Sequence, residues 1–379
     1  MKIAYLSSAA VPSNSAHSLQ VMKMCQAMEQ EGHAVTLMLP PAGKPSPVDA
    51  LNRMYGVNIR FEIRPVELPP ILGRRGLARA LANEAARLAP EMAYTRGIDI
   101  GWAAAARGLH TVVEIHSPPT GWFGPFYLRR LLRFPSVRIL AISHPLEALL
   151  RKRYPALANR PILVAPDAVD LERYKKLPPP EKARALLGLP PKRFTAGYSG
   201  GLVAGRGVEQ ILELAGRLPD VSFLILGGDE LSVPRWKRRT AERENVRWMG
   251  HVPNAKLPLY QAACDALLMP YQRQVTVQDR GNTADIMSPL KLYEYMAAGR
   301  LILASDLPAL RVILNETNSV LLPCDALDPW VQALEKAKRA RVRARRLAER
   351  ARRDVRPFTW RNRIHAIMEF ALEHDKERR

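Results

Sequence analysis

The sequence predicts an α/β protein with two doubly wound parallel sheets. Three observations lead to this fold class: a length of 379 residues, an alternation of short apolar strands with helices, and a proline-rich break between two such runs. A single core rarely organises more than about 250–300 residues, so this length favours two domains. Alternating strands and helices indicate βαβ units, whose parallel sheet is covered by helices on both faces.

The first run predicts an N-terminal domain over residues 1–170. Its opening segment, residues 1–6, is too short for a signal peptide and reads as a first strand. The expected strands are Ile3–Leu6, Val35–Leu39, Met92–Thr95, Thr111–Ile115, Ile139–Ile142 and Ile162–Ala165. The expected helices are Ser18–Gln30, Gly76–Leu88 and Pro145–Lys152. The first helix stops at Gly32, in the place where helices commonly end on glycine.

The second run predicts a C-terminal domain over residues 194–357. Residues 171–193 carry two proline clusters and are expected to form an interdomain linker with one short helix. The expected strands are Phe194–Ser199, Phe223–Leu226, Val246–Met249, Ala266–Met269, Leu301–Ala304 and Val320–Leu322. Because ligands bind beyond the carboxyl ends of such strands, we expect the site in a cleft between two facing domains.

Charge and cysteine content restrict the function classes. The net charge is +21, which suits a nucleic acid, an anionic membrane surface or acidic substrates, but also arginine on solvated helix faces, as over residues 336–363. Cys25, Cys264 and Cys324 are odd in number and lack metal-type spacing, which predicts buried free thiols in a reducing compartment. No run of about 18 apolar residues predicts a membrane span.

The most informative motif runs from Ser288 to Gly299 and predicts a helix with a marked start and stop. Ser288 is expected as the N-cap, Pro289 as a first-turn proline and Gly299 as the terminating glycine. The free backbone amides of Leu290 and Lys291 would then form an anion site at the positive end of the helix. Glu294 lies where a ribose attached to a bound diphosphate would be. A well-capped structural helix with an exposed glutamate gives the same pattern.

A glycine-rich loop after the strand Phe194–Ser199 is a second candidate. Gly200, Gly201, Gly205 and Gly207 permit close backbone approach, and Arg206 can reach a phosphate with its planar fork. The spacing matches neither a dinucleotide fingerprint nor a Walker loop. On its own this loop is a weak phosphate signal.

His116 directly follows the strand Thr111–Ile115 and would face the ligand edge of the sheet, although a histidine capping the next loop is the plainer alternative. The chain contains no Asp-x-Asp pair, no His/Cys cluster with ligand spacing and no Gly-x-Ser-x-Gly elbow. We therefore expect neither a bound metal nor a serine nucleophile.

Taken in order, these motifs resemble the retaining glycosyltransferases of family 4, which have the GT-B fold. The resemblance covers nearly the whole chain and includes the turn Val164–Asp170, the segment Asn245–Val252, the helix Ser288–Gly299 with Ala304–Asp306, and the terminal helix opening at Phe358. It implies that residues 194–357 bind a nucleotide-sugar donor, that residues 1–170 face the acceptor, and that the helix 358–379 returns to the first domain.

The resemblance also implies roles for single residues. Glu294 would bind the donor ribose, and Ser288, Leu290 and Lys291 would meet the diphosphate through backbone amides. Arg206 stands where the family usually has a phosphate-binding lysine. His116 would hydrogen-bond the transferred sugar. The remaining expected contacts are backbone at His251 and Val252, the loop at Gly200 and Gly201, and the first loop at Ser15, Ala16 and His17.

Three departures from the family pattern affect the expected identity of the donor sugar more than the expected reaction class. The first glutamate of the family's paired motif falls on Ile286, with Asp285 or Asp279 as candidate replacements. The arginine that usually precedes the phosphate lysine is Gly201, and the Gly-Gly of the first loop is replaced around residues 15–17.

These observations predict a cytoplasmic, metal-independent retaining glycosyltransferase without a cofactor. Its partners would be a UDP- or GDP-linked sugar and a glycan or lipid-linked acceptor of bacterial cell-surface polysaccharide, lipopolysaccharide or glycolipid synthesis. The segment Phe123–Phe134 suggests docking on an anionic membrane, with Leu128, Leu131 and Leu132 on one face of a helix. The alternatives are a non-catalytic protein that binds an anionic surface or nucleic acid, and a GT-B epimerase or phosphorylase.

Overall fold

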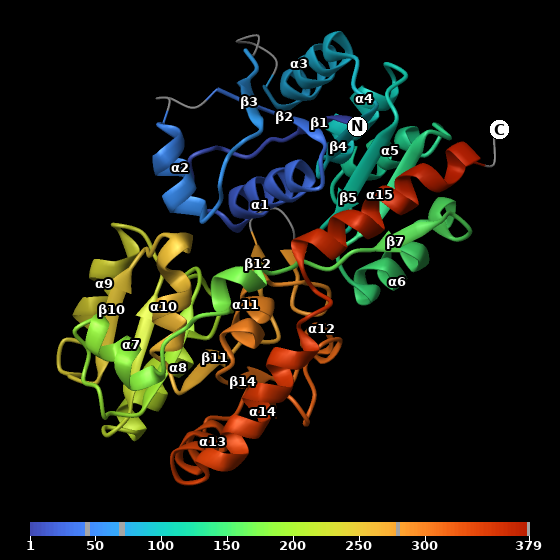
Figure 1. The fold of residues 1–379 in the computed structure, drawn as a ribbon. Helices are drawn as coiled ribbons and strands as arrows, with labels where there is room; N and C mark the ends of the chain where they lie inside the picture. The colour runs from blue at the N-terminus through green and yellow to red at the C-terminus, as the bar shows by residue number, and fades with distance from the viewer. Residues whose placement is uncertain (42–45, 68–72, 278–280, 377–379) are drawn as a thin grey trace. The chain divides into compact units, whose positions relative to one another are not determined.

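A computed structural model describes residues 1–41, 46–67, 73–277 and 281–376 of the chain. The chain divides into two compact units (Figure 1). The first unit comprises Met1–Asp167 together with Trp360–Arg379, and the second comprises Ala168–Thr359.

The first unit is a parallel sheet of seven strands in the order β3-β2-β1-β4-β5-β6-β7. The strands are β1 Lys2–Leu6, β2 Ala34–Leu39, β3 Glu62–Pro65, β4 Met92–Thr95, β5 Thr111–Ile115, β6 Val137–Ala141 and β7 Ile162–Val164. The helices are α1 Ala16–Gln30, α2 Val48–Tyr55, α3 Gly73–Leu88, α4 Ile98–Ala105, α5 Phe123–Leu131, α6 His144–Arg153 and α15 Trp360–Lys376. Helix α1 packs beside α15, whereas α3, α4 and α5 pack in a row (Figure 1).

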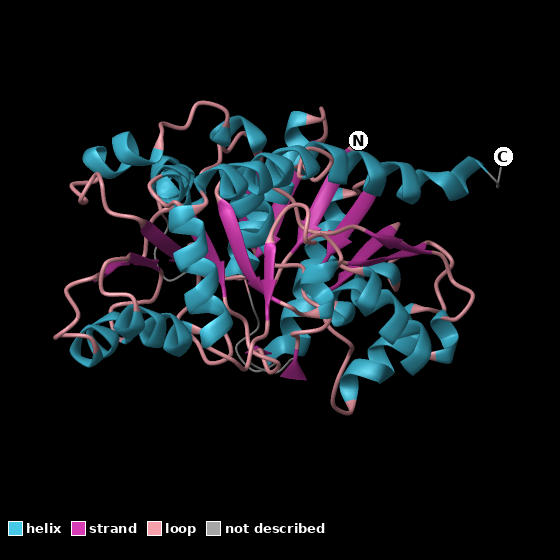
Figure 2. Ribbon diagram, turned by 90° about the horizontal axis from the view of Figure 1, so that it is seen from below, coloured by secondary structure: helices cyan, strands magenta, loops and turns pink. Residues whose placement is uncertain are grey.

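The second unit has a parallel sheet of six strands in the order β10-β9-β8-β11-β14-β15. The strands are β8 Thr195–Ser199, β9 Ser222–Leu226, β10 Val246–Gly250, β11 Ala266–Met269, β14 Leu301–Ser305 and β15 Val320–Leu322, with a separate antiparallel pair β12 Thr276–Val277 and β13 Gly281–Asn282. The helices are α7 Pro180–Leu186, α8 Val208–Arg217, α9 Ser232–Arg239, α10 Leu257–Ala262, α11 Leu290–Ala298, α12 Pro308–Arg311, α13 Asp328–Arg339 and α14 Arg341–Asp354. Figure 2 shows strands lying between layers of helices.

The inner strands of the second sheet, β8, β9, β11 and β14, are buried on both faces, which explains why they read as apolar runs. In β9, Phe223 and Ile225 belong to one hydrophobic cluster, and Leu224 and Leu226 belong to the other. Strands β11 and β14 alternate between the two clusters in the same way. The period of two that separates the clusters follows from the pleat of a strand.

Both sheets share one topology, in which the chain starts near the middle, winds outward to one edge and then returns to wind toward the other. The reversal lies between β1 and β4 in the first unit and between β8 and β11 in the second. This is the doubly wound, Rossmann-like order, and its ligands bind beyond the strand ends that flank the reversal. The expected fold class of two doubly wound parallel sheets is therefore confirmed.

Strand β3 and the short helices α2 and α4 of the first unit were not predicted. Strand β3 carries Glu62 and Arg64 and lies at the sheet edge, where its side chains are only partly buried. Helices α2 and α4 contain eight residues each and have no side-chain cap. The proline-rich residues 171–193, expected as a linker, lie within the second unit, where Ala183 of α7 packs against Ala262 of α10 and the following Ala263.

Two simpler expectations can also be compared with the structure. All three cysteines are buried and free, as expected. Among the residues that the structure describes, no helix is long and apolar enough to cross a membrane.

Candidate functional site

The glycine-rich loop leaves β8 at the reversal of the second sheet and leads into α8, as the sequence predicts. Two of its glycines are required by packing against protein rather than by approach to a ligand. A Cβ at Gly205 would lie 2.1 Å from the carbonyl oxygen of Gln274, and one at Gly207 would lie 1.8 Å from that of Pro270. Both residues have a positive φ, which side-chain-bearing residues rarely adopt. Gly201 has open space instead.

Arg206 is held by an aromatic residue that the sequence analysis did not single out. Its Nη1 donates to the Tyr271 hydroxyl at 2.8 Å, and its guanidinium carbon lies 5.0 Å from the centre of the same ring. Tyr271 lies two residues beyond the end of β11, the strand across the reversal from β8. Its position at a strand's carboxyl end was the signal that could have identified it.

The start of α11 differs from the expectation. The N-cap position is Pro289, not Ser288, and no side chain caps the helix. The Ser288 hydroxyl lies 3.0 Å from the hydroxyl of Tyr293 instead. Proline has a fixed φ and no N–H, so it can precede the first turn without losing a hydrogen bond. Gly299 ends the helix in a left-handed conformation with φ 61°, as expected.

The side chain of Lys291 is buried beneath the glycine loop. Its Nζ lies 3.9 Å from the ring centre of Tyr198 and 5.3 Å from that of Tyr271, and it has no hydrogen-bond partner among the described residues. Burial and then the Arg206 guanidinium lower the pKa of this amine well below its ordinary value, against an opposing effect of Glu294. Two basic groups thus lie around one tyrosine at the strand ends of the second sheet.

Glu294 lies one turn from Lys291 on the same face of α11. Leu290 and Glu294 are the only half-buried positions of this otherwise buried helix. The Asn254 amide donates to Oε1 of Glu294 at 3.2 Å, and Arg173 in turn donates to Asn254. These contacts orient the carboxylate from one side.

The remaining predicted donor contacts lie in the same unit. His251 and Val252 directly follow β10 and are exposed and half-buried, respectively. Ile286 is buried and 6% exposed, whereas the neighbouring Asp285 is exposed. Asp279 lies outside the described residues.

In the first unit, His116 belongs to a buried cluster of charged groups. Its Nε2 is hydrogen-bonded to Oε1 of Glu114, a carboxylate in the middle of β5 that is 0% exposed. Gln20 donates to the same oxygen at 2.8 Å, and Tyr94 donates to the other. Burial alone would raise the pKa of Glu114, but Arg363 and His116 together hold it well below its usual range.

Arg363 joins this cluster to the terminal helix α15. Its Nη2 lies 3.0 Å from Oε2 of Glu114, and it donates to the carbonyl oxygens of Ala165 and Pro166. Burial raises the pKa of the nearby Asp167 to about 7, against the opposing charge of Arg363. The sequence signal for this cluster, which was not recognised above, is a charged residue within an otherwise apolar strand.

The predicted first-loop residues are at the start of α1, where Ser15 has a structural role. Its hydroxyl caps the helix by accepting from the Ser18 backbone N–H at 3.1 Å. Ser13 and Ser18 extend this to a small cluster of hydroxyl groups. Ala16 is exposed and His17 is half-buried.

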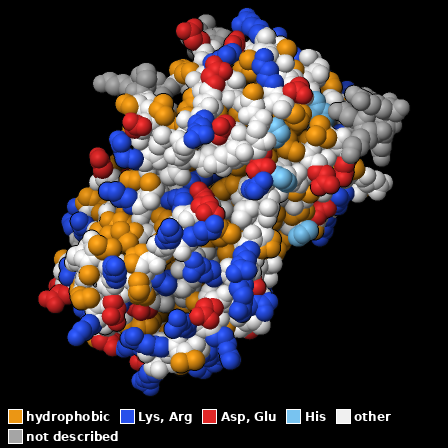
Figure 3. All heavy atoms as spheres, viewed as in Figure 1, with side chains coloured by type: hydrophobic (Ala, Val, Ile, Leu, Met, Phe, Trp, Pro, Cys, Tyr) orange, Lys and Arg blue, Asp and Glu red, His pale blue; other side chains and the backbone are white. Residues whose placement is uncertain are grey.

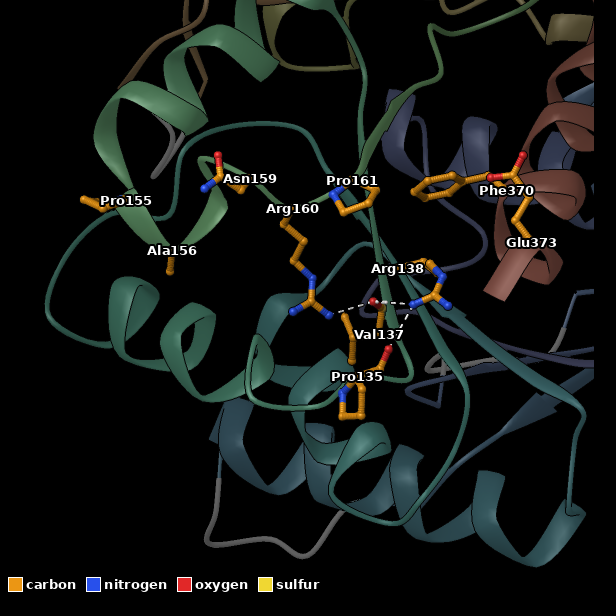
Figure 4. A pocket seen from close by; sticks show the side chains of 10 residues that line it. All are labelled: Pro135, Val137, Arg138, Pro155, Ala156, Asn159, Arg160, Pro161, Phe370 and Glu373. Carbon is orange, nitrogen blue, oxygen red and sulfur yellow. Dashed lines mark hydrogen bonds between the residues drawn. The ribbon is translucent and has the colours of Figure 1, made fainter. Parts of the chain in front are cut away.

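A separate pocket in the first unit lies at the amino ends of β6 and β7 and next to α15 (Figure 4). Arg160 donates to the carbonyl oxygens of Leu132, Phe134 and Val137, and Arg138 donates to that of Pro135. These arginines satisfy backbone groups, and the pocket lies at the opposite strand ends from those where ligands of doubly wound sheets bind.

Among the residues that the structure describes, no group of three or more His, Cys, Asp or Glu side chains is arranged to hold a metal ion. The arrangement in the second unit instead offers basic groups and a helix N-terminus, which suit an anion.

Two known protein families match this chain. The family described as "Glycosyltransferase Family 4" matches residues 18–173, and the one described as "Glycosyl transferase-like" matches residues 206–369. Both matches are to glycosyltransferases, and the one over the N-terminal part of the chain is to family 4. A curated relative, "Putative teichuronic acid biosynthesis glycosyltransferase TuaH" of Bacillus subtilis (strain 168), is 31% identical over 113 residues, which is 30% of this chain and 27% of that relative.

Solved structures with the GT-B fold resemble this chain along nearly its whole length. Sucrose-phosphate synthase from Thermosynechococcus elongatus has a TM-score of 0.75 at 17% identity and covers 99% of this chain and 98% of its own. Anabaena HepE in complex with UDP has a TM-score of 0.73 at 16% identity, with 99% and 100% covered. At such identities the likeness shows the fold.

Proposed function

We propose that this protein transfers a sugar from a nucleoside-diphosphate donor to an acceptor with retention of anomeric configuration. The observation that carries the proposal is the convergence of Arg206, the Lys291 amine and the first turn of α11 at the reversal of the second sheet. Departure of a nucleoside diphosphate leaves negative charge on the phosphate oxygen. Fixed basic groups and backbone amides aimed at that charge stabilise it.

In this proposal the Glu294 carboxylate accepts hydrogen bonds from the ribose hydroxyls. Asn254 holds one carboxylate oxygen, so the side chain is oriented before the donor binds. The backbone at His251 and Val252 contacts the base, and Ser288 and Leu290 contact the diphosphate or the sugar. UDP is the first nucleotide to test, because HepE, a protein of similar fold, has been crystallised with UDP. GDP is the second.

His116 contacts the transferred sugar in this proposal, with its ring oriented by Glu114. The donor phosphate takes the acceptor proton, so that no separate general base is required. The similarity to TuaH supports a glycan or lipid-linked acceptor in bacterial surface polysaccharide synthesis.

Calorimetry with UDP and GDP, followed by release of nucleoside diphosphate from a panel of nucleotide sugars, tests the proposal. Glu294→Ala and Arg206→Ala should each weaken binding by about 1.5–3 kcal/mol, the range for charge-assisted hydrogen bonds. Unchanged affinity in both variants refutes the assigned site. Salt-dependent retention of DNA without donor hydrolysis would instead support a nucleic-acid-binding protein.

We also propose that transfer needs no divalent metal. In this proposal the basic groups near Tyr271 neutralise the charge that develops on the leaving diphosphate. Activity should therefore survive excess EDTA. Loss of transfer that magnesium or manganese restores would contradict this.

A peripheral membrane contact through α5 is part of the proposal, but through a different face from the one expected. Leu128 and Leu131 are buried in the first unit, so the expected leucine face packs inward. The exposed side chains are aromatic and basic: Trp122 is 93% exposed, Phe123 and Phe126 are also exposed, and Arg129, Arg130 and Arg133 flank them. Aromatic side chains bordered by arginine suit the headgroup region of an anionic bilayer.

Vesicle flotation tests this contact. At low salt the protein should float with anionic vesicles and not with neutral ones, and Trp122→Ser with Phe126→Ser should reduce flotation. Replacement of Arg153, an exposed basic residue of α6, serves as the control. Equal flotation of the aromatic variant and the control variant would show that general charge, not α5, holds the protein to the surface.

A further inference from the structure

Lys291 presents a buried amine that the protein itself does not satisfy. The residue is 8% exposed, and its Nζ has no hydrogen-bond partner among the described residues. Buried charged groups are normally paired or hydrogen-bonded, because removing a charge from water is unfavourable by several kcal/mol. A purely structural role would be served better by an apolar side chain of similar length.

The Lys291 amine lies against the glycine-rich loop. A Cβ at Gly200 would lie 2.4 Å from Nζ of Lys291, so any side chain at residue 200 would displace the amine. Gly200 also has a φ of 147°, which favours glycine. The chain therefore combines a lysine on α11 with a residue lacking a side chain directly after β8. This leaves the amine beneath the loop that bears Arg206.

Basic groups outnumber acidic groups around Tyr271. Arg206 and Lys291 contact the same Tyr271 ring, at 5.0 Å and 5.3 Å from its centre. Glu294, the acid on the same face of α11, is hydrogen-bonded to Asn254. An anion placed beside Tyr271 would supply the negative charge that both basic groups lack.

We propose that the Lys291 side chain is a second basic ligand of the donor diphosphate beside Arg206, and that the amine takes up a proton from solvent when the diphosphate binds. This inference rests on the proposed function and extends it, since a contact through the backbone amide alone would leave the side chain unexplained. In the step, a neutral amine and one solvent proton give an ammonium group, and no other bond changes.

The direction in which the pKa of the Lys291 amine is shifted agrees with this geometry. Burial and the adjacent Arg206 both favour the neutral amine in the empty site. A diphosphate reverses the second effect, because an opposite charge nearby favours the charged form. Proton uptake upon binding is therefore expected to disappear when Lys291 is replaced.

Calorimetric titration of the whole chain with UDP and with GDP tests the inference. Titrations in buffers of different ionisation enthalpy give the number of protons taken up. The wild-type protein should take up protons, and Lys291→Met should remove that uptake and weaken binding roughly 10- to 100-fold. Lys291→Arg should keep more affinity than Lys291→Met but show no uptake, because a guanidinium stays protonated. Lys256→Met, at an exposed lysine in the same unit, is the matched control and should match the wild type.

Thermal unfolding without ligand separates this role from a structural one. Lys291→Met should unfold at the same temperature as the wild type or higher, because it removes an unsatisfied buried amine. A variant that binds with wild-type affinity and the same proton uptake overturns the inference while leaving the proposed function intact. A wild-type protein that binds neither nucleoside diphosphate overturns both.

Discussion

Replacing Arg363 by methionine should destabilise the first unit severely. This guanidinium connects the terminal helix α15 to three other segments: it pairs with Glu114 of β5, donates to the carbonyl oxygens of Ala165 and Pro166, and contacts the sulfur of Met24 in α1. Methionine has a similar length but donates no hydrogen bonds. The substitution thus removes the cation that pairs with the Glu114 carboxylate, which keeps Gln20, Tyr94 and His116, and removes the Arg363 donors to two carbonyl oxygens.

The size of the expected stability loss follows from the burial of the Arg363–Glu114 pair. The side chains of Arg363 and Glu114 are 3% and 0% exposed, so the variant leaves a buried carboxylate with less compensation. Breaking one side of such a pair typically destabilises a protein by about 3–5 kcal/mol. Arg361 provides the matched control, because it lies on the same helix and pairs with Glu31 while 72% exposed. Arg361→Met should destabilise by about 0–1 kcal/mol.

The stability deficit of Arg363→Met should change with pH in a defined direction. In the wild type the pKa of Glu114 is held below its unfolded value, so its contribution to stability is present near neutral pH and is lost on acidification through the folded pKa. Without Arg363, burial should raise that pKa. Protonation of Glu114 then relieves the penalty, and the deficit of Arg363→Met should shrink between pH 7 and pH 5. Adding Glu114→Gln should restore part of the lost stability.

Urea denaturation gives the free energy of unfolding, and hydrogen exchange at the amides of β5 and α15 assigns the loss to the first unit. The second measurement is needed because a chain with two units need not unfold in one step. A loss in Arg363→Met no larger than in Arg361→Met, or a deficit that grows on acidification, would refute the reasoning.

Three further predictions concern other positions. Gly207→Ala should destabilise the second unit by more than about 1–2 kcal/mol in urea denaturation, because its Cβ would overlap the Pro270 carbonyl at a positive φ of 77°. Asp167→Asn should flatten the loss of stability that a pKa of about 7 produces as pH rises from about 4 to 7; an unchanged slope in thermal scans would contradict this. Tyr271→Phe should weaken calorimetric UDP binding less than Arg206→Ala, because it removes one hydrogen bond that orients the guanidinium.

The strands could be predicted from the sequence because most are buried on both faces. Ala266–Met269 and Thr111–Ile115 agree with β11 and β5 to the residue. The edge strand β3 was missed, because its charged side chains give no apolar run. The α1 start differed by two residues, since the Ser15 hydroxyl caps a helix that begins before its apolar face.

The site was less predictable than the fold. The position of Glu294 on α11 follows from helical spacing, and so does its shared face with Lys291. The side-chain environment of Lys291 does not, because it depends on Tyr198 and Tyr271, which lie far away in sequence at the ends of β8 and β11. Sequence spacing indicated an anion site made of backbone amides, and the unsatisfied amine emerged only from tertiary packing.

The positions of the basic side chains in the structure help to explain the net charge of +21. Apart from the half-buried Lys338, the basic side chains of α13 and α14 are exposed, and Figure 3 shows Lys and Arg side chains over this part of the second unit. Leu334, Leu347 and Ala351 are buried, which agrees with solvated helix faces. Buried arginines elsewhere satisfy protein groups: Arg184, for example, pairs with Asp265 and donates to two carbonyl oxygens.

Arg206 differs from these structural arginines in what it contacts. Of the described residues, Tyr271 alone accepts a hydrogen bond from its guanidinium, and the contact with the ring leaves donor groups in the plane unused. An arginine that holds loops together uses its fork on carbonyl or carboxylate oxygens, as Arg184 does. An arginine that keeps its fork free beside a second basic group, at the reversal of a doubly wound sheet, is placed for an anion that comes from outside the chain.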